Sequence, residues 1–464
     1  MKIGFVSLGC PKNLVDTEVM MGQLTQQGHE LTPHPGDADV IVVNTCSFID
    51  PAKQESVDTI IEMGKYKQVG RAKRLIVAGC LVERYRGDIQ KDLPEVDALI
   101  GTNELERISA LCEGVEPDTN PLNAYLYHDL TPRVLATPKH FAYIKIAEGC
   151  DHPCTFCVIP QYRGNFRSRR FESVVSETSR LLSQGVREIN LIGQDTTSYG
   201  EDLSLKDGLA KLLARLANIE TAPQPYWIRF LYAYPNRVTQ GLLDTIAEHP
   251  ALAKYIDMPL QHASASVLKR MKRGANADIF LNLIERIRRT IPGVTIRTSM
   301  IVGFPGETEA DFNELCQFVE AAQFERLGAF SYSDEDTSGS FALDQKVDAR
   351  TIYNRKRHLM SLQRKISRRA NKALLSKQVR VLVEGPTADS ELLWQARMQG
   401  QAPEIDGVCY ISDPGEHPLR AGEFRTMQIT EAHDYDLTGT LIDAPEEMPP
   451  ARPGQLVQIG ELVR

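Results

Sequence analysis

The stretch GCDHPCTFC, residues 149–157, follows directly on a predicted buried strand and carries cysteines in the spacing C-x3-C-x2-C. Three thiolates in one loop can converge on one iron–sulfur cube, because cysteine thiolates are the usual ligands of such clusters. A cube has four irons, so three ligands leave one iron open to bind the amino and carboxylate groups of a small molecule. Zinc sites typically use two Cys or Cys/His pairs, and the second pair is missing from this sequence. The spacing therefore predicts a catalytic iron–sulfur cluster on the loop triad, defined as Cys150, Cys154 and Cys157.

The composition is that of an ordinary globular protein, with 42% hydrophobic and 25% charged residues. A length of 464 residues predicts about three domains. No stretch is apolar enough for a membrane span, and the first ten residues end at Cys10 without the cleavage site of a signal peptide. We therefore expect a cytoplasmic protein without membrane contact, whose nine cysteines stay reduced and serve as metal ligands, catalytic groups or core residues.

Three further cysteines lie far apart in the sequence, yet each comes at the end of a predicted strand, in the sequences VSLGC, VNTC and VAGC. The carboxyl ends of parallel strands form the ligand crevice of an open sheet, so these thiols can face one another. A single cysteine after a strand is more often a small buried residue, but three in equivalent positions favour a second three-thiolate cluster. This strand-end triad consists of Cys10, Cys46 and Cys80. The remaining cysteines lack partners at a useful spacing and are interpreted as structural: Cys112, Cys316 and Cys409.

The first hundred residues alternate short β-branched runs with helical patterns. This alternation is typical of βαβ units and predicts an N-terminal doubly wound parallel sheet. The predicted strands are Lys2–Leu8, Val40–Asn44, Arg74–Ala78 and Ala98–Gly101, and the helices include Asn13–Gln27 and Ala52–Lys67.

From about His140 a second alternating series begins, with enough strand–helix units to predict an open or closed α/β barrel. Helices are expected between its strands, for instance at Phe171–Gln184, Leu209–Leu216 and Asp311–Ala322. The predicted strands are Phe141–Ile146, Glu188–Ile192, Trp227–Leu231, Tyr255–Met258, Thr295–Ile301 and Arg326–Phe330.

The C-terminal third begins with Arg350–Lys377, a long and strongly basic helical stretch whose simplest interpretation is a solvated helix face. Short strands with turn signals follow and predict a small antiparallel β-barrel. The proline-containing tail 443–464 is predicted to be flexible, without an assigned function. The strands of the barrel are expected at Val379–Glu384, Leu392–Arg397, Val408–Ile411, Phe424–Thr430 and Leu437–Ile442.

The spacing of the loop triad, with an aromatic residue before the last cysteine, resembles the radical S-adenosylmethionine (SAM) superfamily. The resemblance implies that the open iron binds SAM and that an electron from the cluster cleaves it to a 5′-deoxyadenosyl radical. Two segments agree: residues 190–195 follow a strand where the superfamily binds the methionine part of SAM, and residues 301–308 lie where it carries its adenine motif. By this resemblance the residues that bind the cofactor are Phe156, Gly193, Gln194, Gly303, Gly306 and Glu307.

A strand-end triad followed by a radical SAM motif resembles the methylthiotransferases over nearly the whole chain. Those enzymes insert sulfur into a C–H bond and methylate it, consuming SAM in both roles. By resemblance, the loop triad holds the cluster that generates the radical, and the strand-end triad holds an auxiliary cluster whose open iron carries the sulfur. The implied cofactors are two [4Fe-4S] clusters and SAM.

The resemblance also divides the chain. It implies an N-terminal methylthiotransferase domain at 1–113 and a linker at 114–136. A radical SAM core at 137–374 and a TRAM-like β-barrel at 376–442 follow, before the tail.

Within the methylthiotransferases, the segments 7–16, 194–196 and 402–407 look like the RimO branch, which modifies the β-carbon of an aspartate of small-subunit ribosomal protein S-twelve. The tRNA-modifying branch tends to have Gln-Met-Asn after the first cysteine and Gln-Asn after the later strand. The matching positions here are Pro-Lys-Asn and Gln-Asp. One departure is Arg170, where the RimO branch usually has proline, and it touches the substrate-facing region.

The charge of the predicted C-terminal barrel favours the same branch. Residues 376–442 contain five basic and eleven acidic side chains, a net charge of −6, within a chain of net charge −8. An acidic barrel suits a basic ribosomal protein and is repelled by phosphate, so direct RNA binding is not expected. The expected partners are ribosomal protein S-twelve or the small ribosomal subunit, and an electron donor such as flavodoxin or ferredoxin.

Two other functions remain open from the sequence. The first is a tRNA adenosine methylthiotransferase, for which the basic stretch 350–377 is the best argument. The second is a non-enzymatic iron–sulfur electron carrier or scaffold. Clusters with three ligands speak against a carrier, since carriers normally complete all four positions.

Overall fold

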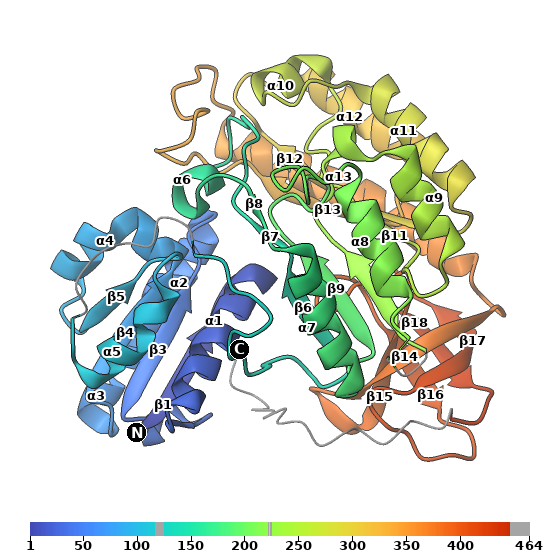
Figure 1. The fold of residues 1–464 in the computed structure, drawn as a ribbon. Coiled ribbons are helices and arrows are strands. Elements are labelled where there is room, and N and C mark those ends of the chain that lie inside the picture. Colours follow the sequence, from blue (N-terminus) through green and yellow to red (C-terminus); the bar gives the residue numbers. More distant parts are fainter. Residues whose placement is uncertain (117–124, 221, 223–224, 446–464) are drawn as a thin grey trace.

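The computed structural model describes residues 1–116, 125–220, 222 and 225–445. These residues form an N-terminal α/β sheet, a central α/β barrel and a C-terminal β-barrel (Figure 1). The flexible tail predicted at 443–464 lies outside the described residues from 446 onward. Asp443 itself accepts hydrogen bonds from the Thr426 N–H and the Arg425 side chain.

The N-terminal sheet has the strand order β2-β1-β3-β4-β5 and is parallel throughout. Methionine and leucine side chains of α1 and α5 cover one face, and α2 and α4 cover the other. This order confirms the predicted doubly wound sheet and places the topological switch point between β1 and β3. The elements are β1 (Lys2–Ser7), α1 (Pro11–Gln26), β2 (Glu30–Leu31), η1 (Pro35–Asp37), β3 (Val40–Thr45), α2 (Asp50–Gly64), α3 (Tyr66–Val69), β4 (Arg74–Gly79), α4 (Cys80–Asp92), β5 (Ala98–Ile100), η2 (Leu105–Arg107) and α5 (Ile108–Glu113).

The central barrel consists of two parallel three-stranded halves, β6-β9-β10 and β11-β12-β13. The Ala233 N–H after β10 donates to the Asp257 carbonyl of β11 and joins the halves. The strands are β6 (Phe141–Lys145), β9 (Glu188–Ile192), β10 (Trp227–Phe230), β11 (Tyr255–Asp257), β12 (Thr295–Val302) and β13 (Arg326–Ser331).

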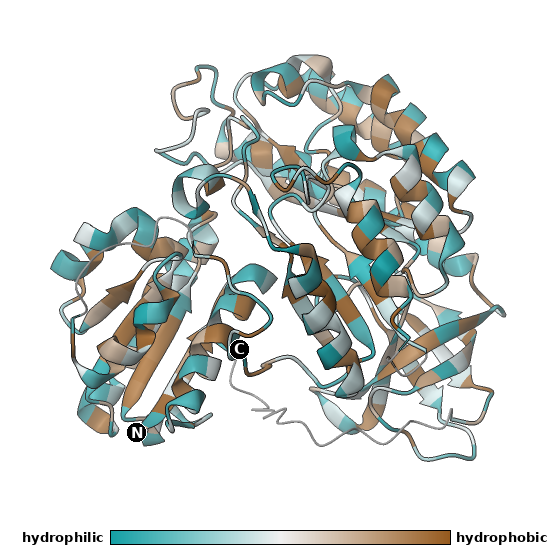
Figure 2. Ribbon diagram, viewed as in Figure 1, coloured by the Kyte–Doolittle hydropathy of each residue, from teal (hydrophilic) through white to brown (hydrophobic). Residues whose placement is uncertain are grey.

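The helices of the barrel pack their apolar faces on the outside of the strands, so that brown strands lie beneath helices with teal outer faces in Figure 2. The inner face is covered differently. Phe141, Tyr143 and Tyr255 pack there against Val15 and Val19 of α1, so the N-terminal domain closes over the barrel. The helices are α7 (Phe171–Ser183), α8 (Gly208–Ala217), η3 (Pro235–Arg237), α9 (Gln240–Glu248), α10 (Ala265–Arg270), α11 (Ala277–Thr290), α12 (Glu309–Ala322) and α13 (Ala349–Lys372).

Three short elements frame the loop triad. Strand β7 (Ala147–Glu148) pairs antiparallel with β8 (Arg167–Ser168), and the cysteine loop and α6 (Ile159–Arg163) lie between them. Two-residue strands carry no periodicity, so the sequence did not reveal them. They fix both ends of the cysteine loop against the barrel.

The C-terminal barrel is closed, in the order β14-β15-β16-β18-β17. One pairing, β16 with β18, is parallel, so the prediction of an antiparallel barrel needs correction at this pair. The long connection through β17 returns the chain in the same direction as β16. The strands are β14 (Gln378–Thr387), β15 (Ser390–Met398), β16 (Cys409–Asp413), β17 (Phe424–Ala432) and β18 (Leu437–Leu441).

Buried charges and one aromatic pair join the two barrels. Arg397 of β15 donates to Glu188 of β9 at 2.6 Å and to Glu384 at 2.6 Å. Trp227 of β10 meets Phe424 of β17 edge to face, with ring centroids 4.8 Å apart. The C-terminal barrel is therefore held on the amino-terminal end of the central strands.

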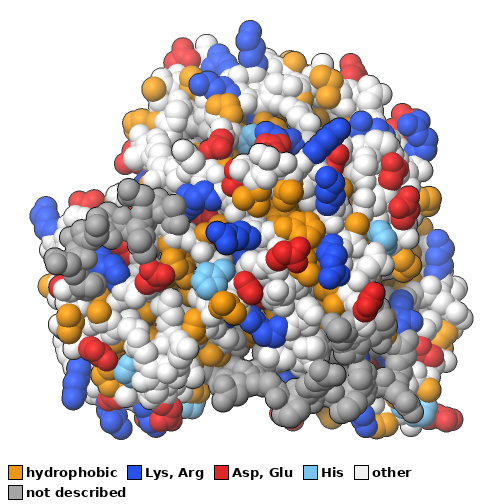
Figure 3. Space-filling view, viewed as in Figure 1, with side chains coloured by type: hydrophobic (Ala, Val, Ile, Leu, Met, Phe, Trp, Pro, Cys, Tyr) orange, Lys and Arg blue, Asp and Glu red, His pale blue; other side chains and the backbone are white. Residues whose placement is uncertain are grey.

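The surface of the face seen in Figure 3 carries basic and acidic side chains interspersed with hydrophobic ones. Among the described residues, none of the helices is long and apolar enough to cross a membrane. Cys112 and Cys409 lie in hydrophobic cores, as expected of structural cysteines. Cys316 packs partly buried against the core of the central barrel.

Candidate active site

The strand-end triad sits at the carboxyl ends of three neighbouring strands. Cys10 follows β1, Cys46 follows β3 and Cys80 follows β4, on both sides of the switch point between β1 and β3. This edge of the N-terminal sheet points toward α6 of the central domain (Figure 1). The structure thus brings the predicted residues to the place where open parallel sheets bind ligands.

Glycines allow the three strand-end loops to approach closely. Gly9 has a φ of +91°, and a Cβ there would lie 2.7 Å from the Cβ of Cys46. Gly79 has a φ of +95°, and a Cβ there would lie 2.3 Å from Asn44 Oδ1. Only glycine adopts these conformations without strain.

Asn13, which is fully buried, ties the loops together. Its Nδ2 donates to the Leu8 carbonyl at 3.1 Å and to the Thr45 carbonyl at 2.8 Å. Its Oδ1 lies 3.8 Å from Cys80 Sγ. One side chain therefore connects the ends of β1 and β3 and the thiol after β4.

The three thiols share one electrostatic environment. Burial raises the pKa of Cys10, but the charges of Lys12 and Arg163 lower it by more than burial raises it. The net pKa of Cys10 therefore lies below the ordinary value. Burial and the neighbouring Cys10 raise the pKa of Cys46 to about 12. Burial raises the pKa of Cys80 despite the nearby Arg163 guanidinium. Thiolate character is thus concentrated at Cys10, and metal binding has to displace protons from the other two thiols.

The loop triad is held by its own turn. Gly149 has a φ of +79°, and a Cβ there would lie 2.1 Å from the Asn165 carbonyl oxygen. The Cys150 N–H donates to the Gly164 carbonyl at 3.2 Å, and the Cys157 N–H donates to the Cys154 carbonyl at 3.2 Å. These bonds fold the nine-residue stretch back on itself, so the three thiols stay in one short loop.

Charge around the loop triad differs from that around the strand-end triad. Burial raises the pKa of Cys150 to about 11 and that of Cys157 to about 12, and nearby thiols add to both shifts. Arg273 Nη1 lies 3.6 Å from Cys154 Sγ. Each triad thus has one arginine at a thiol, but the pKa is raised at Cys150 and Cys157, whereas the strand-end triad contains Cys10 with a lowered pKa.

Within the described part of the chain, no three Cys, His, Asp or Glu side chains converge closely enough to hold a single metal ion. A four-iron cube is larger than an ion and binds each thiolate through a different iron. Two separated sets of three thiols, with no fourth protein ligand predicted for either, fit such cubes with an open iron. They do not fit the closed four-ligand site of structural zinc.

A stacked pair borders the loop triad. The His152 ring stacks on Tyr234 with centroids 3.7 Å apart, and Arg273 lies over the same tyrosine ring, 4.5 Å from its centroid. His152 Nε2 is 2.6 Å from Asp195 Oδ2. Burial raises the pKa of Asp195, but hydrogen bonds from His152, Ser198 and Thr197 outweigh it and lower the net pKa. The loop triad is thereby tied to the segment that follows β9.

The segment predicted to bind the methionine part of SAM lies beside this stack. A Cβ on Gly193 would meet only ordinary contacts, at 3.5 Å and beyond, so packing alone does not require glycine there. Gln194 Nε2 donates to Glu148 Oε1 at 2.6 Å, and its Oε1 is buried without a protein partner. Phe156 packs partly buried against the barrel core. The unpaired amide oxygen of Gln194 fits a donor supplied by a ligand.

The predicted adenine segment is shaped by packing. Cβ atoms on Gly303 and Gly306 would lie 2.3 Å from Ile352 and 2.5 Å from the Arg270 guanidinium. Glu307 Oε2 accepts from the Gly303 N–H at 2.6 Å, and its Oε1 accepts from Arg355 at 2.8 Å. The Glu307 carboxylate therefore closes its own loop, and its predicted contact with SAM stays a prediction.

A buried charge network connects the two triads, and sequence reasoning missed it. Arg163 Nη1 donates to Asp16 Oδ2 at 3.0 Å and to Glu148 Oε2 at 3.1 Å. Arg163 Nη2 donates to Asn13 Oδ1 at 2.5 Å and lies 3.6 Å from Cys80 Sγ. Lys145 Nζ donates at 2.5 Å to both Asp16 and Glu148.

The network spans the two domains. Asp16 and Asn13 belong to α1, whereas Glu148 lies two residues before the loop triad, and Arg163 is the last residue of α6, which follows the cysteine loop. The pKa of Glu148 lies well below its usual range, because Arg163 and Lys145 outweigh the effect of burial. A lysine inside a predicted buried strand was the sequence signal that could have indicated a buried ion pair.

Comparison with known proteins identifies the family. The chain is 74% identical, over the full length of both chains, to a ribosomal protein uS12 methylthiotransferase RimO of Solibacter usitatus. It is 57% identical to one of Koribacter versatilis, with 95% of this chain and 96% of the relative covered. The chain belongs to the RimO family.

Models of three families match successive parts of this RimO family member. Uncharacterized protein family UPF0004 matches residues 2–101, the radical SAM superfamily matches 144–319, and the TRAM domain matches 377–442. These matches confirm the predicted resemblance to radical SAM methylthiotransferases and the order of the fold types along the chain.

Among solved structures, the radical SAM methyltransferase TsrM from Kitasatospora setae, with cobalamin and a [4Fe-4S] cluster bound, has a similar fold. The TM-score is 0.52 at 14% identity, and the match covers 71% of this chain and 72% of TsrM. At this identity the similarity concerns the fold alone.

Proposed function

We propose that this protein methylthiolates the β-carbon of an aspartate of ribosomal protein uS12, with one SAM as methyl donor and another as radical source. The curated relatives are named ribosomal protein uS12 methylthiotransferases. The observation that carries the proposal is Arg163, which contacts the Cys80 thiol of one triad and Glu148, next to the other. One side chain that contacts a thiol of one triad and the glutamate two residues before the other suits a reaction that needs a radical and a sulfur donor at the same carbon.

The loop triad would hold the cluster that cleaves SAM, and the strand-end triad would hold the auxiliary cluster. When bound, the clusters supply the electron for SAM cleavage and the site for the sulfur to be inserted. The donor set supports this assignment, since each triad consists of thiols alone. The protein's own contribution is to hold the two sets of thiols in fixed positions.

The network around Arg163 provides this rigidity. Its charges are balanced, with Asp16 and Glu148 opposite Lys145 and Arg163. A buried pair of this kind is costly to break because an uncompensated charge then stays buried. The N-terminal domain is also clamped at a second place, where Arg84 donates to Glu335 of the central domain at 2.5 Å. Movement of one triad relative to the other is therefore opposed.

Around the loop triad, SAM contacts are proposed for Phe156, Gly193, Gln194, Gly303, Gly306 and Glu307. Gln194 supports this assignment best. Its amide nitrogen is fixed by Glu148, which aims a buried and unpaired oxygen away from the network. An acceptor of this kind suits the ammonium group of the methionine part of SAM.

The C-terminal barrel is proposed to dock the basic target protein through its acidic surface. The segment at residues 402–407, which resembles the RimO branch, reaches into the central barrel. Tyr143 donates to Glu404 at 3.0 Å, and Tyr255 donates to Asp406 at 2.7 Å. This anchoring holds the acidic barrel at a fixed distance from the site. The electron is proposed to come from a small carrier such as flavodoxin or ferredoxin.

A reconstituted enzyme tests the function. The iron-loaded protein, incubated without oxygen with SAM, a chemical reductant and uS12, is expected to form 5′-deoxyadenosine and to add a methylthio group to one aspartate of uS12. Absence of 5′-deoxyadenosine would remove the radical mechanism and leave the iron–sulfur carrier as the better description. Formation of 5′-deoxyadenosine without any change in uS12 would instead direct attention to another substrate.

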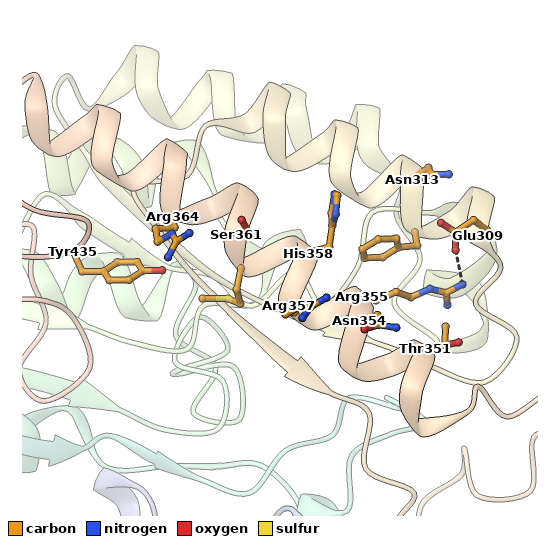
Figure 4. A pocket seen from close by; sticks show the side chains of 12 residues that line it. Glu309, Asn313, Thr351, Asn354, Arg355, Arg357, His358, Ser361, Arg364 and Tyr435 are labelled. Atoms are coloured by element: carbon orange, nitrogen blue, oxygen red, sulfur yellow. Dashed lines mark hydrogen bonds and ion pairs between the residues drawn. The ribbon is translucent and has the colours of Figure 1, made fainter.

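A second candidate, tRNA adenosine methylthiolation, is favoured by α13. This helix contains nine basic residues and no acidic one. Together with α12 it lines an open groove of about 990 Å³, and Arg357, His358, Arg364 and Tyr435 are among its lining side chains (Figure 4). Phe312 of α12 also lines this groove. Basic and aromatic side chains in a groove are typical of RNA contacts. Mass spectrometry of tRNA nucleosides after the same incubation separates the two: the proposal predicts no methylthio-adenosine.

A further inference from the structure

Lys12 carries a positive charge into the space between the two triads. It is two residues after Cys10, at the start of α1, and is only 8% exposed. Its Nζ lies 3.4 Å from the Gly193 carbonyl oxygen and 3.5 Å from the centroid of the Tyr232 ring. Gly193 belongs to the segment that follows β9, so Lys12 reaches from the N-terminal domain to the wall of the SAM site.

Among the residues that the structure describes, Lys12 makes no ion pair with a carboxylate. The adjacent carboxylates cannot compensate it, because Asp16 and Glu148 are already balanced by Lys145 and Arg163. A carbonyl and an aromatic face satisfy a buried ammonium only in part. The buried Lys12 ammonium therefore has no carboxylate partner among the described residues, and the anion that acts on it is the Cys10 thiolate, which is proposed to bind the cluster.

The backbone conformation of Tyr232 determines its contact with Lys12. Tyr232 has a φ of +65°, a strained conformation for a tyrosine. Its N–H donates to Asp257 at 3.0 Å, and its carbonyl accepts from the Thr196 N–H at 3.2 Å. Strain that is over-determined by hydrogen bonds marks functional positions. Here it turns the tyrosine ring toward Lys12.

We infer that Lys12 forms a carboxylate subsite that binds the side-chain carboxylate of the target aspartate and orients its β-carbon between the triads. This inference rests on the proposed function, whose substrate is an anionic side chain. A carboxylate placed on Lys12 completes the missing ion pair, and it lies beside the thiol of Cys10 on one side and Gly193 on the other.

The methionine end of SAM also has a carboxylate and is the other possible source of this ligand. One observation favours the target. Lys12 belongs to the N-terminal domain, next to the triad proposed to deliver sulfur, whereas the segments proposed to bind SAM belong to the central domain.

Peptide binding tests the subsite directly. The probes are a peptide of the modified uS12 loop and the same peptide with asparagine in place of the target aspartate. Their dissociation constants are measured on the iron-loaded enzyme with S-adenosylhomocysteine present. The wild type is expected to prefer the aspartate peptide about ten-fold to a hundred-fold, the range of a charge-assisted hydrogen bond. Lys12→Met is expected to bind both peptides equally, and Lys12→Arg is expected to keep part of the preference.

The preference is a ratio within one variant, so it does not depend on how much of that variant is folded or loaded. Lys91→Met, which removes an exposed lysine of α4 in the same domain, is the matched control and is expected to keep the wild-type ratio. A Lys12→Met variant that still prefers aspartate would overturn the inference. So would an unchanged ratio accompanied by weaker S-adenosylhomocysteine binding or by loss of iron. In those cases Lys12 binds the carboxylate of SAM or balances the charge of the cluster.

Failure of the proposed function gives a different result. If wild-type enzyme neither binds the aspartate peptide nor modifies uS12, the proposed substrate is wrong, and the inferred carboxylate subsite is wrong as well. If wild-type enzyme modifies uS12 and Lys12→Met retains the aspartate preference, only the subsite is wrong.

Discussion

The loop triad and the strand-end triad reach the same number of ligands by opposite routes. The thiols of the loop triad lie within residues 150–157, in one turn closed by its own backbone hydrogen bonds. Those of the strand-end triad come from positions 10, 46 and 80 and meet because three parallel strands end at one edge. The geometry of the loop triad is encoded locally, whereas the geometry of the strand-end triad exists only once the N-terminal sheet has folded.

The two sites also differ in what surrounds them. The loop triad borders aromatic rings and the segments proposed to bind SAM, with Arg273 at one thiol. The strand-end triad borders α1, Lys12 and the network of Arg163. This division fits a site that makes a radical beside a site that supplies sulfur. If the division holds, each triad can lose its iron and its function independently of the other.

The largest effect is expected from removing thiols. Wild-type protein should bind about eight irons in two four-iron clusters. A Cys150→Ala, Cys154→Ala variant should lose about half of them and all SAM cleavage, because the radical cluster is gone. A Cys46→Ala, Cys80→Ala variant should also lose about half of its iron, but should still cleave SAM without forming methylthio product. Iron assay, 5′-deoxyadenosine chromatography and peptide mass spectrometry measure the three quantities.

Either of two results would contradict the assignment of a separate sulfur-delivering cluster to the strand-end triad. Full iron content in the Cys46→Ala, Cys80→Ala variant would show that the strand-end triad holds no cluster. Methylthio product from that variant would show that sulfur is delivered from elsewhere.

The next effect concerns the link between the triads. Arg163→Met leaves Asp16 and Glu148 with Lys145 as their only buried cation, which should destabilise the protein by about 3–5 kcal/mol. Denaturant unfolding measures the loss, and product formation should fall further than SAM cleavage because the triads lose their common partner. Arg289→Met, at an exposed position of α11 outside the site, is the control. Equal stability of the two variants would contradict a structural role for Arg163.

A smaller and more selective effect is expected at Gly79. Gly79→Ala forces a Cβ against Asn44 Oδ1 and Thr45 at a φ of +95°, so the loop with Cys80 must shift. The free energy of unfolding should fall by about 1–3 kcal/mol, and iron should be lost from the strand-end cluster first. Gly87→Ala, in α4 with no atom within 4 Å of the new Cβ, should be neutral or slightly stabilising. Loss of loop-triad iron in Gly79→Ala would mean that the two sites are not separable.

The smallest expected effect is a pH dependence where the barrels meet. Burial raises the pKa of Glu384, but Arg397 and His140 outweigh it and hold the pKa at about 2, below the ordinary value of 4.5. A depressed carboxyl pKa adds stability above the unfolded pKa, and this stability is lost as the pH falls from about 4.5 to about 2. Glu384→Gln should therefore flatten the dependence of unfolding free energy on pH between 5 and 3, followed by tryptophan fluorescence. An unchanged slope would indicate that the carboxylate gains nothing from Arg397.

Much of the fold and both triads could be predicted from local signals. Strand β9, Glu188–Ile192, is where the pattern placed it, and the ends of β1, β3 and β4 were predicted within one residue. The triads followed from cysteine spacing and from the equivalence of strand ends. The charge network could not be predicted in the same way, since Asp16 and Arg163 are 147 residues apart.

The parallel pairing of β16 and β18 was missed for a related reason. Alternating patterns indicate that a strand exists and which face is buried, but strand order and direction depend on how the whole barrel closes. Lys12 shows the intermediate case. Its residue type distinguished the branches in the sequence, but only the structure shows that, among the described residues, its ammonium is buried without a carboxylate partner.

A mass comparison of ribosomal protein uS12 from strains with and without this gene tests the proposed function most directly. We expect uS12 to carry a methylthio increment on one aspartate only when the gene is present, while methylthio-adenosine in tRNA is unchanged. An identical uS12 mass in both strains, with loss of methylthio-adenosine from tRNA, would contradict the proposed function.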